Sequence, residues 1–265
     1  MTRGLHCERG MAIVVALMAM LVMAAIGAAL VVAAATESRI SRNFRNNTEA
    51  LYAADAVLER VVDELRGIAD WNLLVSGNLR STFVDGEPAG ARTLADASTI
   101  DLGAILNDLN CQKVSGCSGA AMDAITADRP WGPNNPRWQL FAWGHLSRLL
   151  PAGAIDSPFY VVVMVADDPS ECDDNPLVDG GAVVSCPPGT MVNPGTGVLD
   201  VRAEAFGPFG AHRVVEVTVA RPVPSARVPE VMPAEPSAEN TGIMVGSETG
   251  PAEAGVRTLS WRAVK

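Results

Sequence analysis

Residues 8–35 read ERGMAIVVALMAMLVMAAIGAALVVAAA, and this stretch decides the fold of the chain. From Met11 to Ala35 it contains no charged residue and no proline. As an α-helix, about 25 residues at about 1.5 Å each span roughly 37 Å, which is enough to cross a bilayer with some tilt. The apolar part of a signal peptide is only about 7–15 residues long. The stretch therefore predicts one membrane-spanning helix over 11–35 rather than a cleaved signal peptide.

The flanking charges predict the orientation of this helix. Arg3 and Arg9 precede it, and Glu37 and Arg39 follow it. Because basic residues stay on the cytoplasmic side of a membrane, residues 1–10 form a cytoplasmic leader and the rest is exported. We therefore expect a single-pass membrane protein whose residues after about 36 are exported. The net charge of -10 argues against a nucleic-acid partner, which requires a basic surface.

The helix is predicted to continue beyond the membrane as an amphipathic half over 36–66. No proline interrupts 11–66, and Gly67 is a stop signal. Apolar residues recur at three- and four-residue steps, which is typical of one helix face that packs on a globular domain: Ile40, Phe44, Leu51, Ala54, Leu58, Val61, Val62 and Leu65. The alternative is a membrane helix, a break and a separate core helix.

The head, 67–220, is predicted to end in an antiparallel sheet. Residues 159–166 form a β-branched run, and 197–206 and 213–220 alternate between apolar and polar residues. Gly207-Pro208-Phe209-Gly210 between the last two runs predicts a hairpin. The fold class is thus α+β, with a long N-terminal helix packed on an antiparallel sheet.

Two segments follow the predicted hairpin. Residues 221–255 are rich in proline, alanine, glutamate and serine, which indicates a flexible segment. Residues 256–265 regain strand character in the sequence VRTLSWRAV, so they are a possible terminal edge strand.

The exported part contains four cysteines, Cys111, Cys117, Cys172 and Cys186, whereas Cys7 lies in the leader. An even set of thiols in an oxidising compartment indicates two disulfides. Three pairings are possible, and we favour the local ones, Cys111–Cys117 and Cys172–Cys186. A zinc site is disfavoured because there is no CxxC pair and no histidine nearby in the sequence.

Acidic residues crowd the segment after the 159–166 run: Asp167, Asp168, Glu171, Asp173, Asp174 and Asp179. Oxygen-rich loops can hold Ca²⁺, so Asp167, Asp168, Asp173 and Asp174 are candidate ligands. The EF-hand pattern is absent, and the simpler interpretation is a solvated loop pinned by Cys172–Cys186. We predict no resident cofactor or metal.

The residue types needed for catalysis form no recognisable motif. His145 and His212 are the only exported histidines, and Gly116-Cys117-Ser118-Gly119 is not a G-x-S-x-G elbow. We therefore predict no catalytic residue. The tryptophans of the same region are expected to pack in the core or in loops rather than to form a ligand platform: Trp131, Trp138 and Trp143.

The N-terminal sequence resembles a known family. Glu8-Arg9-Gly10 followed directly by MAIVVAL resembles a type IV prepilin. The longer stretch over 8–66, which includes TESRISRNFRNNTEALYAADAVLERVVDEL, resembles the N-terminal module of PilX-type minor pilins. The resemblance implies that Gly10 precedes the bond cut by the prepilin peptidase and that Met11 becomes an N-methylated amino terminus. The alternative is an uncleaved membrane anchor.

One position departs from the pattern of major pilins, which carry Glu at the fifth mature residue. Here that residue is Val15, so the pair that this glutamate forms with a neighbouring subunit is lost. The resemblance then implies a minor pilin that initiates or caps the filament near its tip. Its partners would be other pilins, the prepilin peptidase and the inner-membrane assembly platform. The resemblance also implies that the chain lies in the bacterial inner membrane with its head in the periplasm, and later in the pilus filament on the cell surface.

Two alternatives to this function stay open. The first is a pseudopilin of a type II secretion system, and the second is a signal-anchored periplasmic enzyme or binding protein. Gly27, in the middle of the apolar run, costs about 1 kcal/mol of helix stability relative to Ala. A further hypothesis is that the helix opens locally near Gly27 during extraction from the membrane or packing.

Overall fold

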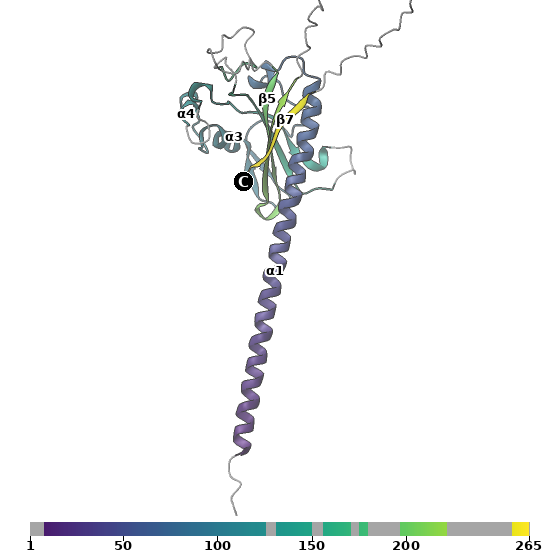
Figure 1. Cartoon of the computed structure of the whole chain (residues 1–265), viewed down its shortest axis with the longest axis vertical. Helices are drawn as coiled ribbons and strands as arrows, with labels where there is room; N and C mark the ends of the chain where they lie inside the picture. Colours follow the sequence, from purple (N-terminus) through teal and green to yellow (C-terminus); the bar gives the residue numbers. More distant parts are fainter. Residues whose placement is uncertain are drawn as a thin grey trace, which may run out of the picture. The chain divides into compact units, whose positions relative to one another are not determined.

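The computed structural model describes residues 8–125, 131–149, 156–170, 175–179, 197–221 and 256–264. The chain divides into two compact units, Met1–Thr48 and Glu49–Lys265, and each is described by itself. Its elements, several of which are labelled in Figure 1, are α1 (Glu8–Arg66), α2 (Asn72–Val75), β1 (Ala91–Thr93), β2 (Thr99–Asp101), α3 (Leu102–Cys111), α4 (Gly119–Asp123), η1 (Gly132–Asn134), β3 (Gln139–His145), η2 (Leu146–Arg148), β4 (Tyr160–Asp167), β5 (Val198–Phe206), η3 (Pro208–Gly210), β6 (His212–Ala220) and β7 (Arg257–Val264).

Helix α1 is continuous from Glu8 to Arg66, so the alternative with a break is wrong. The described side chains of residues 11–45 are exposed. Burial begins at Ala50 and follows one face of the helix: Ala50, Ala53, Ala54, Val57, Leu58, Val61, Val62 and Leu65. Ile40 and Phe44, predicted to share the packing stripe, are exposed. Periodicity indicates an apolar face, but it does not reveal which molecule that face contacts.

The sheet is a five-stranded antiparallel meander in the order β3-β4-β5-β6-β7, which confirms the predicted fold class. Strands β5 and β6 form the predicted hairpin, and η3 connects them. Strand β7 pairs with β6 at the edge of the sheet, where the sequence predicted a terminal strand. Figure 1 shows β5 and β7 in this sheet.

Strand β3 was not predicted from the sequence. Its residues, QLFAWGH, include no β-branched residue and show no clear alternation, because the strand is buried on both faces. A register shift between Leu140 and Ala142 further obscures the pattern. The strand nevertheless pairs with β4 from Gln139↔Val165 to His145↔Tyr160.

The two faces of the sheet pack against different elements. The inward side chains of β4, β5 and β6, such as Val163, Val201 and Val217, form one core with residues 50–65 of α1. On the opposite face, Tyr160, Val162, Met164 and Ala166 of β4 form a second core with α3 and with Trp138, Leu140 and Trp143. Strand β4 is therefore buried on both faces, which explains its continuous apolar run.

On this second face, the outward residues of β5 and β6 are largely polar, in contrast to those of β4. They include Asp200, Arg202 and Glu204 on β5, and Glu216 and Thr218 on β6. The second core does not extend over them, since it reaches only Phe206 on β5. This side of the sheet is the floor of the groove described below.

Candidate functional site

The first candidate site is the apolar surface of α1 in the unit Met1–Thr48. Among the described residues, α1 is the one helix long and apolar enough to cross a membrane. Its large apolar side chains are exposed all around the helix, including Met11, Val14, Leu17, Leu21 and Ile26. A helix that is apolar on every side is stable only in lipid or among other helices.

The predicted processing residues lie in the first turn of α1. The helix begins at Glu8, so Gly10 and Met11 have helical backbones rather than the extended form expected for a protease substrate. The first turn of any helix is its weakest, because its N–H groups lack intrahelical partners. Val15 and Gly27 lie further along the same helix, and a Cβ added at Gly27 would meet no atom within 4 Å.

The end of α1 is fixed to the head by hydrogen bonds of side chains that belong to no recognisable sequence motif. Ser81 Oγ and the backbone N of Thr82 donate to the two Glu64 oxygens at 2.5 and 3.0 Å. Arg221 Nη1 and Nη2 donate to the carbonyls of Ala69 and Ile68 at 2.7 and 2.9 Å. The Arg221 guanidinium also lies 4.2 Å from the centre of the Trp71 ring. Because Arg221 directly follows β6, its two hydrogen bonds join that strand to the segment just after α1.

The cysteines and the acidic segment fall partly outside the described residues. Cys111 and Cys117 form the predicted local disulfide, which closes a short loop after α3. Cys172 and Cys186 lie outside the described residues, as do two of the calcium candidates, Asp173 and Asp174.

The other calcium candidates, Asp167 and Asp168, lie at the end of β4 and just after it. Ser170 N and Oγ donate to Asp168 at 2.7–3.0 Å. Asp179, in the same acidic run, accepts from the backbone N of Gly197 at 2.7 Å, and burial raises its pKa to about 6. Among the described residues no group of three or more His, Cys, Asp or Glu side chains is arranged to hold a metal.

The second candidate site is the polar face of β5, β6 and β7, which carries a row of paired charges. Arg202 Nε donates to Glu204 at 2.8 Å, and Arg202 Nη1 donates to Glu216 at 3.3 Å. Arg262 donates to the other Glu216 oxygen at 2.5 Å, and His212 Nε2 lies 2.9 Å from the other Glu204 oxygen. Both carboxylates thus accept a hydrogen bond from Arg202, and Glu216 accepts a second one from Arg262.

The pKa values of two acids on this face are shifted in opposite directions. Burial alone would raise the pKa of Glu204, but His212 and Arg202 more than offset this and hold that pKa below its usual value. Asp200 accepts a hydrogen bond from Thr218 Oγ1 at 2.8 Å, and burial raises the pKa of Asp200 to about 7.

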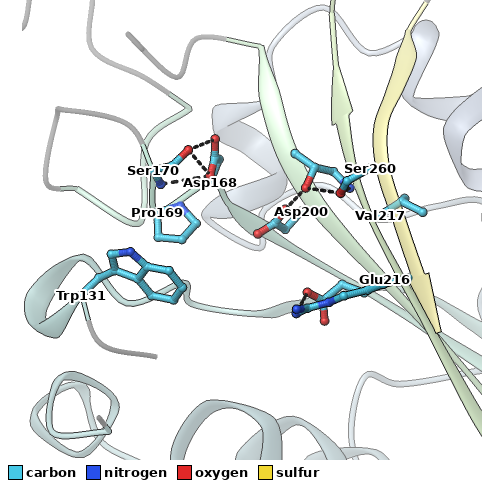
Figure 2. Close-up of a pocket in the computed structure, with 10 residues that line it drawn as sticks. Trp131, Asp168, Pro169, Ser170, Asp200, Glu216, Val217 and Ser260 are labelled. Carbon is cyan, nitrogen blue, oxygen red and sulfur yellow. Dashed lines mark hydrogen bonds and ion pairs between the residues drawn. The ribbon is translucent and has the colours of Figure 1, made fainter. Parts of the chain in front are cut away.

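A groove of about 970 Å³ runs over this row. A smaller hollow of about 250 Å³ shares Trp131, Pro169, Asp200, Glu216 and Arg262 with it. In Figure 2 the indole of Trp131 and Pro169 lie on one side of the hollow, with Asp200, Glu216 and Ser260 on the other. Trp138 and Trp143 are buried as predicted, but Trp131 is 43% exposed and lines the groove.

The histidines do not form a catalytic arrangement with a nucleophile in the described parts of the chain. His212 stacks on Phe206 and pairs with Glu204, and His145 meets the Tyr160 ring edge-on at 5.0 Å. No hydrogen bond joins either histidine to a serine, threonine or cysteine among the described residues.

Helix α1 exposes an apolar surface before residue 46 and packs on an antiparallel sheet after residue 49. Comparison of the sequence with models of protein families finds a match to this helix. The family model described as PilX N-terminal matches residues 9–59. Residues 9–59 form a PilX-type N-terminal module. A search of the curated proteins and a search of the solved structures each found no match.

The PilX-type module is characteristic of type IV pilus minor pilins, whose family and fold are structural rather than enzymatic. It implies association with other pilins in a pilus. The module ends at residue 59, inside the buried face of α1, so it includes both exposed apolar residues and residues of the head core. The polar groove lies entirely outside the matched segment.

Proposed function

We propose that this chain is a minor pilin that takes part in type IV pilus assembly and initiates or caps the filament near its tip. The observation that carries the proposal is the PilX-type module at residues 9–59, in which α1 exposes an apolar surface on every side. In the inner membrane this surface contacts lipid, and in a filament it contacts the helices of other pilins. The head stays in the periplasm until assembly, because the basic leader stays in the cytoplasm.

Processing precedes assembly in this proposal. The prepilin peptidase cuts between Gly10 and Met11 after the first turn of α1 opens, and Met11 is then N-methylated. Opening this turn costs little because its N–H groups have no intrahelical partners and Gly10 disfavours the helix. Intact-mass measurement of the chain purified from its own cells tests this step. Loss of residues 1–10 with one added methyl group supports processing, whereas an intact leader contradicts it.

Val15 supports a place at the tip rather than along the shaft. A carboxylate at this position would be costly in lipid unless it paired with the amino terminus of a neighbouring subunit. Val15 has no charge to bury in lipid, and it forms no ion pair with the amino terminus of a neighbouring subunit. No electrostatic attraction therefore draws this subunit into the filament next to a subunit that is already assembled. Its incorporation then depends on the head and on the remaining helix surface.

The tip position is tested by labelling the chain in sheared pili. We expect label at one end of the filament, and label along the shaft at the abundance of the major pilin would contradict the proposal. Val15→Glu should move label into the shaft, whereas the matched control Val14→Glu, one residue away on the helix, should not. A deletion strain that keeps its pili but loses secretion of enzymes would instead indicate a type II secretion pseudopilin.

Gly27 offers a further test of the assembly step. Because a Cβ at Gly27 meets no atom within 4 Å, Gly27→Ala fits the isolated helix and stabilises it by about 1 kcal/mol. If the helix opens near Gly27 during extraction or packing, the variant should enter pili less efficiently. Incorporation equal to that of the wild type would refute this role.

A further inference from the structure

The groove over the polar face of the sheet has the form of a ligand site. Its volume of about 970 Å³ lies at the upper end of the range of about 300–1,000 Å³ that is usual for small-molecule sites. Its floor is formed by Asp200, Arg202, Glu204, Glu216 and Arg262. Its walls come from three separate segments: Ile105, Asp108, Leu109 and Gln112 in or next to α3, Trp131, Pro136 and Trp138, and Pro169.

Buried side-chain amides tie these walls together. Asn110 on α3 donates to the carbonyl of Trp138 at 3.0 Å and accepts from its backbone N at 2.9 Å. Asn134 Nδ2 donates to the carbonyl of Pro169 at 3.2 Å, which joins the second wall to the third. Asn135 accepts from the backbone N of Trp131 at 3.1 Å. The groove is therefore pre-formed, so ligand binding does not require a loss of conformational entropy to order its walls.

Four charged side chains of the floor form a balanced row. The carboxylates of Glu204 and Glu216 are matched by the guanidinium groups of Arg202 and Arg262. In this row a phosphate or sulfate would meet two carboxylates, and a cation would meet two guanidinium groups. Two further acids line the groove, Asp108 and Asp200, and they disfavour an anion further. Asp200 accepts a hydrogen bond from the Thr218 hydroxyl at 2.8 Å, so it adds a polar group of the same kind to the floor. Each carboxylate oxygen accepts one hydrogen bond in the row and has a further lone pair, and each guanidinium has more donors than the row uses. The floor therefore suits a neutral ligand with many hydroxyl groups.

The exposed ring of Trp131 supplies the apolar element that such a ligand needs. It borders the groove opposite the polar floor, as Figure 2 shows for the hollow that continues it. The face of an indole is electron-rich, so it attracts the slightly positive C–H groups that cover one face of a sugar ring. A ring face on one side and fixed donors and acceptors on the other match the two kinds of surface on a pyranose.

We propose that this groove binds a neutral oligosaccharide, with one sugar ring on Trp131 and its hydroxyls on the Arg202–Glu204–Glu216–Arg262 row. The proposal goes beyond the assembly function and is independent of it, since every lining residue belongs to the head and lies outside residues 9–59. A peptide is the weaker candidate. Extended peptides are bound mainly through backbone hydrogen bonds to a strand edge, whereas this floor presents side chains from a sheet face.

The test uses the full chain in a polyoxyethylene detergent, since a detergent with a sugar headgroup would compete for the site. Isothermal titration calorimetry is performed with maltohexaose, cellohexaose, chitohexaose and a capped proline-rich decapeptide. We expect at least one oligosaccharide to bind with a dissociation constant below about 1 mM. Trp131→Ala should weaken this binding by about tenfold or more, and Trp131→Phe, which keeps a ring, by less than about threefold.

Trp261→Ala is the matched control. Trp261 is another exposed tryptophan, but its partner in the sheet is Val217, whose side chain faces the opposite core. This variant should bind the sugar as the wild type does, and circular dichroism should show that all three variants are folded. The proposal is overturned if no oligosaccharide binds at about 10 mM, if only the peptide binds, or if Trp131→Ala and Trp261→Ala bind equally well. Pilus assembly by Trp131→Ala should be unchanged.

Discussion

Replacement of Arg221 by methionine should loosen the join between the sheet and the end of α1. The substitution keeps the length and apolar stem of the side chain but removes the guanidinium group. Three interactions are lost at once: the bonds of 2.7 and 2.9 Å to the carbonyls of Ala69 and Ile68, and the contact of 4.2 Å with the Trp71 ring. The two carbonyls are then left to find other donors.

The magnitude follows from these contacts. A hydrogen bond from a charged group contributes about 1.5–3 kcal/mol when buried, and a cation–π contact about 0.5–2 kcal/mol. Because Arg221 is only half-buried, water can replace part of the loss, and we expect the free energy of unfolding to fall by about 2–4 kcal/mol. For a domain of this size, that corresponds to a melting temperature lower by roughly 5–12 °C.

Thermal unfolding of the full chain in detergent, followed by near-ultraviolet circular dichroism, measures this change. Arg221→Lys keeps the charge but not the paired donors, so its melting temperature should lie between those of the wild type and Arg221→Met. Arg213→Met is the control, because Arg213 Nη1 bonds only to the neighbouring His212 carbonyl among the hydrogen bonds of the described residues. A melting temperature for Arg221→Met within about 1 °C of the Arg213→Met value would refute the reasoning.

Further perturbations test the rest of the head. Since burial raises the pKa of Asp200 to about 7, the folded chain binds this proton more tightly than the unfolded chain, and stability falls as the pH rises from about 4 to 7. Asp200→Asn should flatten that slope and add about 2 kcal/mol to the free energy of unfolding at about pH 8, measured with urea. A Cβ at Gly207 would lie 2.1 Å from the buried Phe159 ring, so Gly207→Ala should cost about 1–3 kcal/mol and Phe159→Leu should recover part of it. Replacing both Cys111 and Cys117 by serine should cost about 2 kcal/mol, and an unchanged urea midpoint would show that the loop needs no disulfide.

Much of the fold could be predicted because its elements have periodic sequences. The continuous helix follows from the 56 residues of 11–66, which contain no proline, and β5 and β6 follow from their alternation of apolar and polar residues. Strand β3 was not predicted, because a strand buried on both faces lacks that alternation. Ile40 and Phe44 were predicted to pack on the head, but they are exposed. Their helical spacing continues that of the buried residues, so the sequence does not show where contact with the head begins.

Part of the row Arg202–Glu204–Glu216–Arg262 could be predicted from the sequence. Alternation places Asp200, Arg202 and Glu204 on one face of a strand, and that signal was available. The pairing of Arg202 with Glu216, however, depends on the β5–β6 register, and Arg262 reaches Glu216 only through β7. Arg221 had no local signature, since its two carbonyl partners lie more than 150 residues earlier in the chain. Such long-range pairs depend on how the strands are ordered and aligned in the sheet. The periodicity of the sequence does not reveal that order or alignment.

The order of the strands also implies a gradient of local stability across the sheet. At one edge, residues 81–83 cover β3 through the bonds Ser81 N to Phe141 O and Trp143 N to Phe83 O. At the other edge, β7 pairs with β6, and in the described parts of the chain no strand pairs with its outer side. Amide hydrogens of β7 should therefore exchange with solvent by sub-global opening, long before those of β4 and β5. Such an opening exposes unpaired backbone N–H and C=O groups of Val214–Val219 in β6, to which a strand of another molecule can pair. By covering this edge, β7 protects the head against aggregation.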